Sequence, residues 1–245
     1  MKTIDLNCDV GEGVGLEAEI LPLVSSANIA CGAHAGDHET MVSVLRLAEQ
    51  LGVCPGAHPG FSDRENFGRL ELTLSAPEIH SLVTKQLVAL AQVGVFRYVK
   101  PHGALYNMAA RDEAVAESVV SAVKDFDPSL WMMGLAGSVL LRGADRAGLT
   151  VVGEAFADRR YDEPGRLVSR TEPDAVIESQ EEAVAQGLEI VRNRRVKSRL
   201  GHWVEVDAQS ICIHGDNPHA LQFARSLREA FSATDIVVQR FWHSV

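Results

Sequence analysis

Acidic, amide, imidazole and basic side chains recur at the ends of short apolar segments in this sequence. They are Asp5, Asn7, Asp9, Glu12, Asn28, His34, His58, Asp63, Lys100, His102, Glu154, Asp158, Arg159, Arg160, His214 and Asp216. Carboxylates and imidazoles act as general acids and bases and also ligate divalent ions, whereas lysine and arginine bind anions. The set is therefore typical of an enzyme that performs acid–base chemistry on a small charged molecule.

The apolar segments themselves predict the scaffold that positions these groups. Each segment is short and is followed within a few residues by a turn or a helix, as strands of a parallel sheet are. The predicted strands cover residues 3–7, 27–31, 53–57, 96–100, 130–134, 149–155 and 210–214. We expect a β/α barrel of seven strands, with a doubly wound open sheet as the alternative. In either fold the carboxyl ends of the strands form the ligand crevice, so six separate segments would converge on one pocket.

Helix boundaries are marked by capping residues. Ser75 and Glu78 form a capping box, Asp37 and Ser179 are further N-cap candidates, and Asn217 would cap the last helix. The predicted helices cover residues 37–52, 75–94, 112–124, 138–147, 179–191 and 218–231. No composition shift or linker interrupts this alternation, so we expect a single domain over residues 1–245.

Composition narrows the function classes. The net charge is −10, and a chain this acidic with only one short basic run disfavours nucleic-acid and membrane-surface binding. The longest apolar stretch is interrupted by glycines and is too short to span a bilayer, and acids stand where a signal peptide would be apolar. The four cysteines are scattered without a C-x-x-C pair. We therefore expect a cytoplasmic protein with reduced thiols.

Several residues also have purely structural interpretations. Asp5 and Asn7 alternate with apolar neighbours and could form a polar layer inside the barrel. One or two of the four strand-end histidines could only brace loops, and Arg159 could belong to a solvated pair. P-loop, G-x-S-x-G and H-E-x-x-H motifs are absent from the sequence, so those nucleotide, serine-hydrolase and zincin sites are not indicated.

Eight blocks of the sequence, in order, resemble the LamB/YcsF family, whose members are also called PxpA proteins, the A component of 5-oxoprolinase. The blocks are DLNCDVGEG (5–13), SANIACGAHAGD (26–37), GAHPGFSD (56–63), FGR (67–69), VKPHGALYN (99–107), GEAFADRRY (153–161), LVSR (167–170) and IHGDNPHAL (213–221). The resemblance implies a distorted seven-stranded TIM-like barrel of the glycoside hydrolase/deacetylase type. It also implies ATP-dependent hydrolysis of 5-oxo-L-proline (pyroglutamate) to L-glutamate, with ATP as co-substrate, in a complex with PxpB and PxpC.

With that reaction in view, we assign hypothetical roles to the matching residues. Asp9, or the pair His214 and Asp216, would act as the general base, and His102 would donate a proton to the leaving nitrogen. Lys100 with Arg159 or Arg170 would hold a carboxylate or phosphoryl group. The remaining candidates would orient the substrate or bind a divalent metal, whose presence the sequence leaves undecided; they are Asn7, Glu12, His34 and His58.

Two other functions remain open from the sequence. One is a metal-dependent hydrolase or deacetylase that acts alone on a small amide or sugar. The other is a non-catalytic subunit that presents substrate to partner proteins. The density of acid–base residues favours an enzyme.

Overall fold

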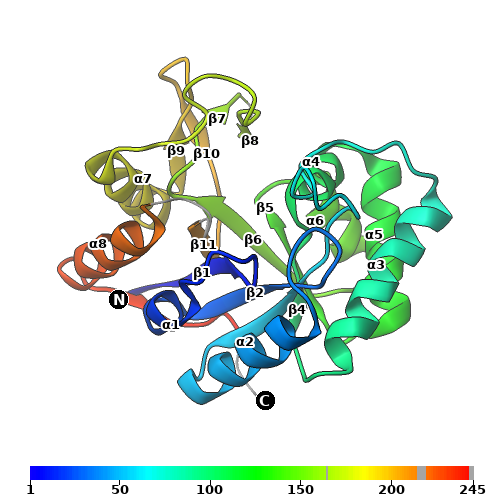
Figure 1. Cartoon of the computed structure of the whole chain (residues 1–245). Coiled ribbons are helices and arrows are strands. Elements are labelled where there is room, and N and C mark those ends of the chain that lie inside the picture. Colours follow the sequence, from blue (N-terminus) through cyan, green and yellow to red (C-terminus); the bar gives the residue numbers. More distant parts are fainter. Residues whose placement is uncertain (164, 214–218, 243–245) are drawn as a thin grey trace.

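Seven parallel strands form a closed barrel at the centre of the computed structural model, which describes residues 1–163, 165–213 and 219–242 (Figure 1). The strands are β1 (Lys2–Val10), β2 (Ser26–Ala30), β3 (Cys54–His58), β4 (Tyr98–Val99), β5 (Trp131–Leu135), β6 (Val151–Phe156) and β11 (Ser210–Ile213). Neighbours follow the order β11-β6-β5-β4-β3-β2-β1, and a further pairing of β11 with β1 closes the ring. The predicted barrel is therefore confirmed, and the open sheet is excluded.

β1 is the longest strand and carries the seam of the barrel. Residues Asp5 to Cys8 pair with Ser210 to Ile213 of β11, and Asn7 to Val10 pair with Ser26 to Ile29 of β2. The first half of β1 also pairs with β12 (Ile236–Val238), a strand that the sequence pattern did not predict. Because side chains alternate across a strand, Asp5, Asn7 and Asp9 share one face of β1.

The inside of the barrel contains a layer of polar side chains. Its buried polar side chains include Asp5, Asn7, Ser26, Asn28, Lys100, Glu154 and Ser210, and they form hydrogen bonds with one another across the strands. The main hydrophobic core lies outside this ring, where apolar strand residues pack against the helices.

Gly56 is needed for the ring of Tyr98 to fit inside the barrel. A Cβ atom at position 56 would lie 2.3 Å from two atoms of that ring, far inside van der Waals contact. The ring is fully buried, and its hydroxyl donates a hydrogen bond to Asn28 Oδ1 over 2.6 Å. Glycine therefore makes room for a side chain that supports the polar interior.

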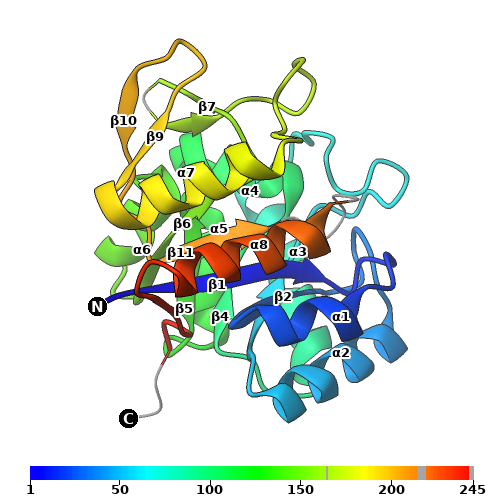
Figure 2. The ribbon, with the colours of Figure 1, turned by 90° about the vertical axis from the view of Figure 1, so that its left-hand side faces the viewer.

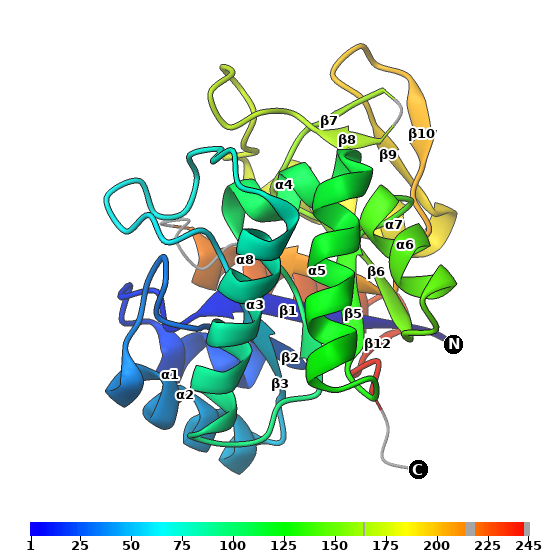
Figure 3. The same ribbon diagram turned by 90° about the vertical axis from the view of Figure 1, so that its right-hand side faces the viewer.

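Helices surround the barrel. They are α1 (Glu17–Ile20), η1 (Leu21–Leu23), α2 (His38–Leu51), α3 (Ala76–Ala91), α4 (Gly103–Arg111), α5 (Glu113–Phe126), α6 (Val139–Arg146), α7 (Gln180–Asn193) and α8 (Ala220–Ser232). α7 and α8 pack together on one side of the barrel (Figure 2), and α3 and α5 pack together on another (Figure 3). Among the described residues, no helix combines the length and the hydrophobicity that crossing a bilayer requires.

The capping signals located helix starts well. Asp37 accepts a hydrogen bond from Thr40 N at the start of α2, and Ser75 and Glu78 form the predicted capping box of α3. Ser179 caps α7 as expected. The predicted cap at Asn217 lies outside the described residues. The short helices α1 and α4 were not predicted.

Two antiparallel hairpins also escaped prediction. β7 (Tyr161–Asp162) pairs with β8 (Arg166–Leu167), and β9 (Arg195–Lys197) pairs with β10 (Trp203–Glu205). Both stand out from the barrel on the same side in Figure 1 and in Figure 2. The four cysteines are buried and free, as expected for reduced thiols.

Candidate active site

A cavity of about 570 Å³ lies at the carboxyl ends of the barrel strands. Its lining includes seven of the predicted residues, which are Asp9, Glu12, His58, Lys100, His102, Arg159 and Arg170. They come from β1, β3 and the segments that follow β1, β4, β6 and β8. The predicted convergence of separate strand ends on one pocket is therefore observed. His214 and Asp216 lie outside the described residues.

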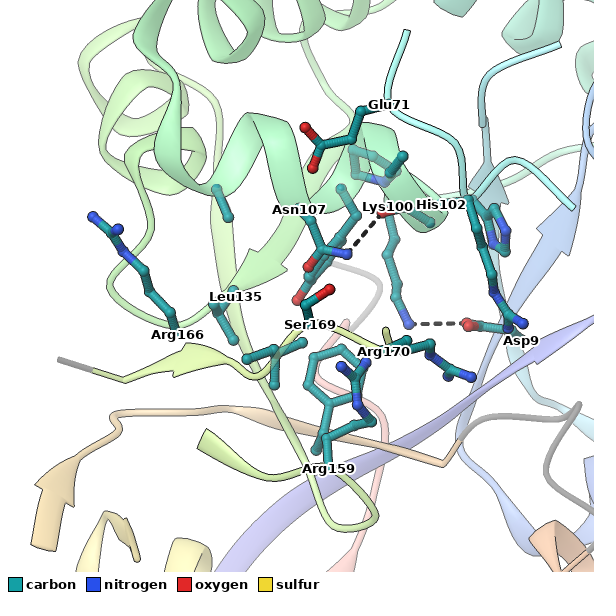
Figure 4. A pocket seen from close by; sticks show the side chains of 18 of the residues that line it. Asp9, Glu71, Lys100, His102, Asn107, Leu135, Arg159, Arg166, Ser169 and Arg170 are labelled. Atoms are coloured by element: carbon teal, nitrogen blue, oxygen red, sulfur yellow. Dashed lines mark hydrogen bonds and ion pairs between the residues drawn. The ribbon is translucent and has the colours of Figure 1, made fainter. Parts of the chain in front are cut away.

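Lys100 is the buried cation of the site. Its ammonium lies 2.9 Å from Asp9 Oδ1 and 2.8 Å from Glu154 Oε1, and 3.3 Å from Asn7 Oδ1. Burial alone would lower the pKa of Lys100, but Asp9 and Glu154 outweigh it and raise that pKa well above its ordinary value. Lys100 therefore stays charged, and in Figure 4 it points toward Asp9.

Glu154 and Asn7 hold this lysine from behind the cavity wall. Glu154 is fully buried and accepts hydrogen bonds from Tyr106 Oη over 2.8 Å and from Asn7 Nδ2 over 2.9 Å. Neither Glu154 nor Asn7 lines the cavity. The geometry therefore does not support the predicted contact of Asn7 with substrate, and it makes both residues positioning groups for Lys100.

His58 and His102 turn one ring nitrogen each toward the other. His58 Nδ1 lies 2.7 Å from the carbonyl oxygen of Lys100, and His102 Nε2 lies 2.8 Å from that of Phe67. A carbonyl oxygen only accepts, so these two nitrogens carry the protons. Burial lowers the pKa of His102 below its ordinary value, which keeps the ring neutral. His58 Nε2 and His102 Nδ1 form a hydrogen bond with each other over 3.0 Å.

The role of His102 as the acid for a leaving nitrogen stays a prediction. His102 Nε2 donates its hydrogen to the Phe67 carbonyl, so Nδ1 is the ring nitrogen turned toward His58 and Glu12. In its unprotonated form such a nitrogen can ligate a metal.

Two carboxylates join these two ring nitrogens and complete a set that fits a divalent cation. Asp9 Oδ2 lies 3.4 Å from His58 Nε2, and Glu12 Oε1 lies 3.2 Å from His102 Nδ1. One ligand atom from each of these four residues lies within 4.8 Å of the others. Carboxylate oxygens and imidazole nitrogens are ligand atoms that divalent cations take in proteins. Imidazole held by a backbone carbonyl is a common arrangement around protein metals.

His34 supports this cluster from behind. Its ring stacks on that of His102 at 3.7 Å between centroids and 3° between planes. His34 Nε2 donates to Glu12 Oε1 over 3.2 Å, and burial lowers the pKa of His34 to about 4. His34 does not line the cavity, so its predicted contact with substrate is not supported and its geometry is that of a positioning residue.

The other side of the cavity is rich in arginine. Arg159 and Arg170 reach the space below Lys100 from the segments after β6 and β8, and Ser169 lies beside them (Figure 4). Arg159 is only 3% exposed, and its guanidinium donates to the carbonyl oxygens of Ala175 and Val168. Burial, followed by the nearby charge of Arg170, lowers the pKa of Arg159 to about 10.

Further lining residues were not singled out from the sequence. They include Arg69, Glu71, Tyr106, Asn107, Arg111, Phe156, Arg166 and Ser169. Tyr106 and Asn107 stand on α4, and Arg166 on β8, two elements that the periodicity did not reveal. Arg69 belongs to the FGR block, which was the one signal that pointed to it.

Comparison with known proteins gives consistent matches over almost the whole chain. The LamB/YcsF family matches residues 4–244. The crystal structure of a lactam utilization protein from Thermus thermophilus has a TM-score of 0.89 and 43% sequence identity, with 98% of this chain and 100% of that chain covered. A family 4 carbohydrate esterase from Streptomyces lividans, in complex with acetate, has a TM-score of 0.50 and 11% identity, with 98% and 93% covered. At that identity the esterase shares only the fold.

Proposed function

Because the chain belongs to the LamB/YcsF family, we propose that it is the PxpA component of an ATP-dependent 5-oxoprolinase. In this proposal it is a cytoplasmic hydrolase that opens 5-oxo-L-proline to L-glutamate together with PxpB and PxpC. The observation that carries the proposal is the cavity in which Asp9, Lys100 and the two imidazoles of His58 and His102 meet. The similarity to a lactam utilization protein supports a cyclic amide as the substrate.

The chemistry explains why ATP is needed. An amide carbon is a poor electrophile, and a five-membered lactam closes readily. Transfer of the γ-phosphoryl group of ATP to the amide oxygen, with ADP leaving, activates the ring carbon. Water adds to that carbon, the carbon–nitrogen bond breaks and the nitrogen takes a proton; a second water releases phosphate. One lactam, one ATP and two waters thus give glutamate, ADP and phosphate.

Asp9 and Lys100 have the geometry for complementary roles in this sequence. Asp9 Oδ1 is held by Lys100 and by Asn28 Nδ2 at 2.7 Å, so the carboxylate is fixed and remains open to the cavity. It would take a proton from the attacking water and return it to the ring nitrogen. Lys100 would stabilise the negative charge of the phosphoryl group carried by the former amide oxygen.

A divalent cation would be held by Asp9, Glu12, His58 and His102 and would supply Lewis-acid chemistry when bound. The residues fit it because their four ligand atoms lie close to one another. Glu154 and His34 would keep the ligands and Lys100 in place, as their contacts with Lys100 and Glu12 indicate.

The decisive experiment measures glutamate formed from 5-oxo-L-proline and ATP by the full chain, with and without its two candidate partners. Asp9→Asn should reduce the rate at least about a hundredfold, while Glu181→Gln, at the exposed start of α7, should leave it unchanged. If no combination containing the parent chain forms glutamate, the proposed function is wrong. If cavity substitutions weaken only assembly with the partners, the chain presents substrate to them instead.

A second candidate is a stand-alone metal-dependent deacetylase. The observation that favours it is the convergent acid and imidazole set, together with a barrel that resembles a carbohydrate esterase in fold. Release of acetate from an acetylated amine by the chain alone, without ATP and blocked by a chelator, would establish it.

A further inference from the structure

The charge of the cavity wall is opposite to that of the whole protein. Among the described residues, the lining includes six basic side chains, which are Arg69, Lys100, Arg111, Arg159, Arg166 and Arg170. The same lining includes three acidic side chains, which are Asp9, Glu12 and Glu71. The chain as a whole has a net charge of −10. A positive hollow in an acidic protein concentrates anions.

The basic side chains of the wall are held in different ways. Lys100 is paired with Asp9 and Glu154, and Arg111 Nη2 lies 2.7 Å from Glu71 Oε1. Arg159 instead donates to the backbone carbonyls of Ala175 and Val168. A carbonyl orients a guanidinium without cancelling its charge, so Arg159 brings its positive charge to the cavity in a fixed position.

Arg159 and Arg170 are also close enough for their like charges to interact. After burial, the charge of Arg170 is the largest influence that lowers the pKa of Arg159, and it is larger than the opposing influence of Asp158. Both arginine side chains reach the same space opposite Lys100 (Figure 4). Bringing two guanidinium groups together beside a buried cavity costs free energy. An anionic ligand that enters the cavity beside them would be attracted by both charges.

We infer that Arg159 and Arg170, with the hydroxyl of Ser169 beside them, form a subsite for a phosphoryl group in the same cavity as Asp9 and Lys100. The guanidinium of Arg170 and the N–H groups of Arg159 that the carbonyls leave over offer several donors, which suit the three oxygens of a phosphoryl group better than the two of a carboxylate. The cavity of about 570 Å³ also has the size of a site for drug-sized ligands, roughly 300–1,000 Å³, and greatly exceeds a five-membered lactam.

The identity of the molecule that carries the phosphoryl group rests on the proposed function. If that function is correct, the carrier is either the phosphorylated lactam or a nucleotide, and both present the same group to the arginines. The lactam ring of the former would then lie toward Asp9 and Lys100.

The test is calorimetric titration of the isolated full chain with orthophosphate and with a non-hydrolysable ATP analogue. The parent should bind orthophosphate, and Arg159→Gln and Arg170→Gln should each weaken that binding by about tenfold or more. Arg146→Gln, on the exposed face of α6, is the matched control and should bind like the parent. Because Arg170 is only half-buried, its variant tests the subsite even if loss of Arg159 disturbs folding.

Titration with the ATP analogue distinguishes a nucleotide from the phosphorylated lactam as the carrier of the phosphoryl group. Tighter binding of the analogue than of orthophosphate, with the same dependence on Arg159 and Arg170, supports the subsite with a nucleotide as the carrier. Binding of orthophosphate without the analogue supports it with a phosphorylated substrate.

The inference is overturned if orthophosphate does not bind, or if both variants bind orthophosphate like the parent. It is also overturned if 5-oxo-L-proline displaces orthophosphate and its own binding is lost in the same two arginine variants, because the arginines would then bind the carboxylate of the lactam. These results do not depend on turnover. A chain that binds phosphate through Arg159 and Arg170 but never forms glutamate would disprove the proposed function and leave the subsite intact.

Discussion

Asp5 gives the barrel interior a measurable dependence on pH. Burial is the main reason that its pKa rises from 3.8 to about 6, despite hydrogen bonds from the hydroxyls of Ser210, Ser26 and Ser25. A carboxyl with a higher pKa in the folded state binds its proton more tightly there than in the unfolded chain. Its contribution to stability is therefore complete below about pH 4 and is lost as the pH rises through about 6. About two pKa units correspond to roughly 3 kcal/mol.

Asp5→Asn removes this titration and keeps the shape of the side chain. The free energy of unfolding of the variant, minus that of the parent, should rise by about 3 kcal/mol between about pH 4 and about pH 7 and then stay constant. Urea denaturation followed by circular dichroism across this range measures the difference directly. The variant has lost one hydrogen-bond acceptor, so its absolute stability is less informative than the change of the difference with pH.

Asp145→Asn is the matched control, since Asp145 lies exposed on α6 and its replacement should give a difference that is small at every pH. If the difference in the free energy of unfolding between Asp5→Asn and the parent is also independent of pH, the reasoning is refuted. Asp5 would then have the same proton affinity in the folded and the unfolded state.

Three further predictions concern the site. Lys100→Met leaves the carboxylates of Asp9 and Glu154 without their cation and should lower the free energy of unfolding by about 3–5 kcal/mol, as measured by denaturation; a loss below about 1 kcal/mol would contradict the buried triad. His58→Ala should weaken Co²⁺ binding, followed by its visible absorption, by more than the roughly 10–100-fold that substitutions around metal ligands cost, and equal affinity would remove His58 from the ligand set. Gly60→Ala places a Cβ 2.8 Å from His34 Nδ1 and should lower the free energy of unfolding by about 1–3 kcal/mol, as measured by thermal or urea denaturation. Gly143→Ala in α6 is the control, because its Cβ would have its nearest contact at 3.9 Å, and it should leave the stability unchanged or raise it.

The positions of the barrel strands along the chain and the position of the site could be predicted because both follow from local signals. Each barrel strand is an apolar segment beside a turn, and the polar groups directly follow it. Asp9, His58 and Lys100 were found in this way, because parallel strands bring their carboxyl ends to one edge whatever the separation along the chain. Capping residues such as Asp37 and Ser75 located helix starts for the same reason, since a cap acts within one turn.

What could not be predicted depends on contacts between distant residues. Glu154 ends a strand like the other candidates, yet only the register of β6 with β11 and the depth of its side chain show that it supports Lys100 from behind. The proton positions on His58 and His102 follow from two backbone carbonyls that no sequence pattern identifies. α4 escaped because it is short, and the hairpins because two or three paired residues leave no detectable periodicity.

The register of β1 has a consequence for how this protein can change over time. One strand supplies the seam of the barrel and also presents Asp5, Asn7 and Asp9, while Ile4, Leu6, Cys8 and Val10 face the hydrophobic core. Sliding that strand by one position would exchange every polar side chain for an apolar one. Insertions and deletions should therefore be tolerated in the projecting hairpins but not between residues 2 and 10, where a single added residue would open the ring and dismantle the chemistry together.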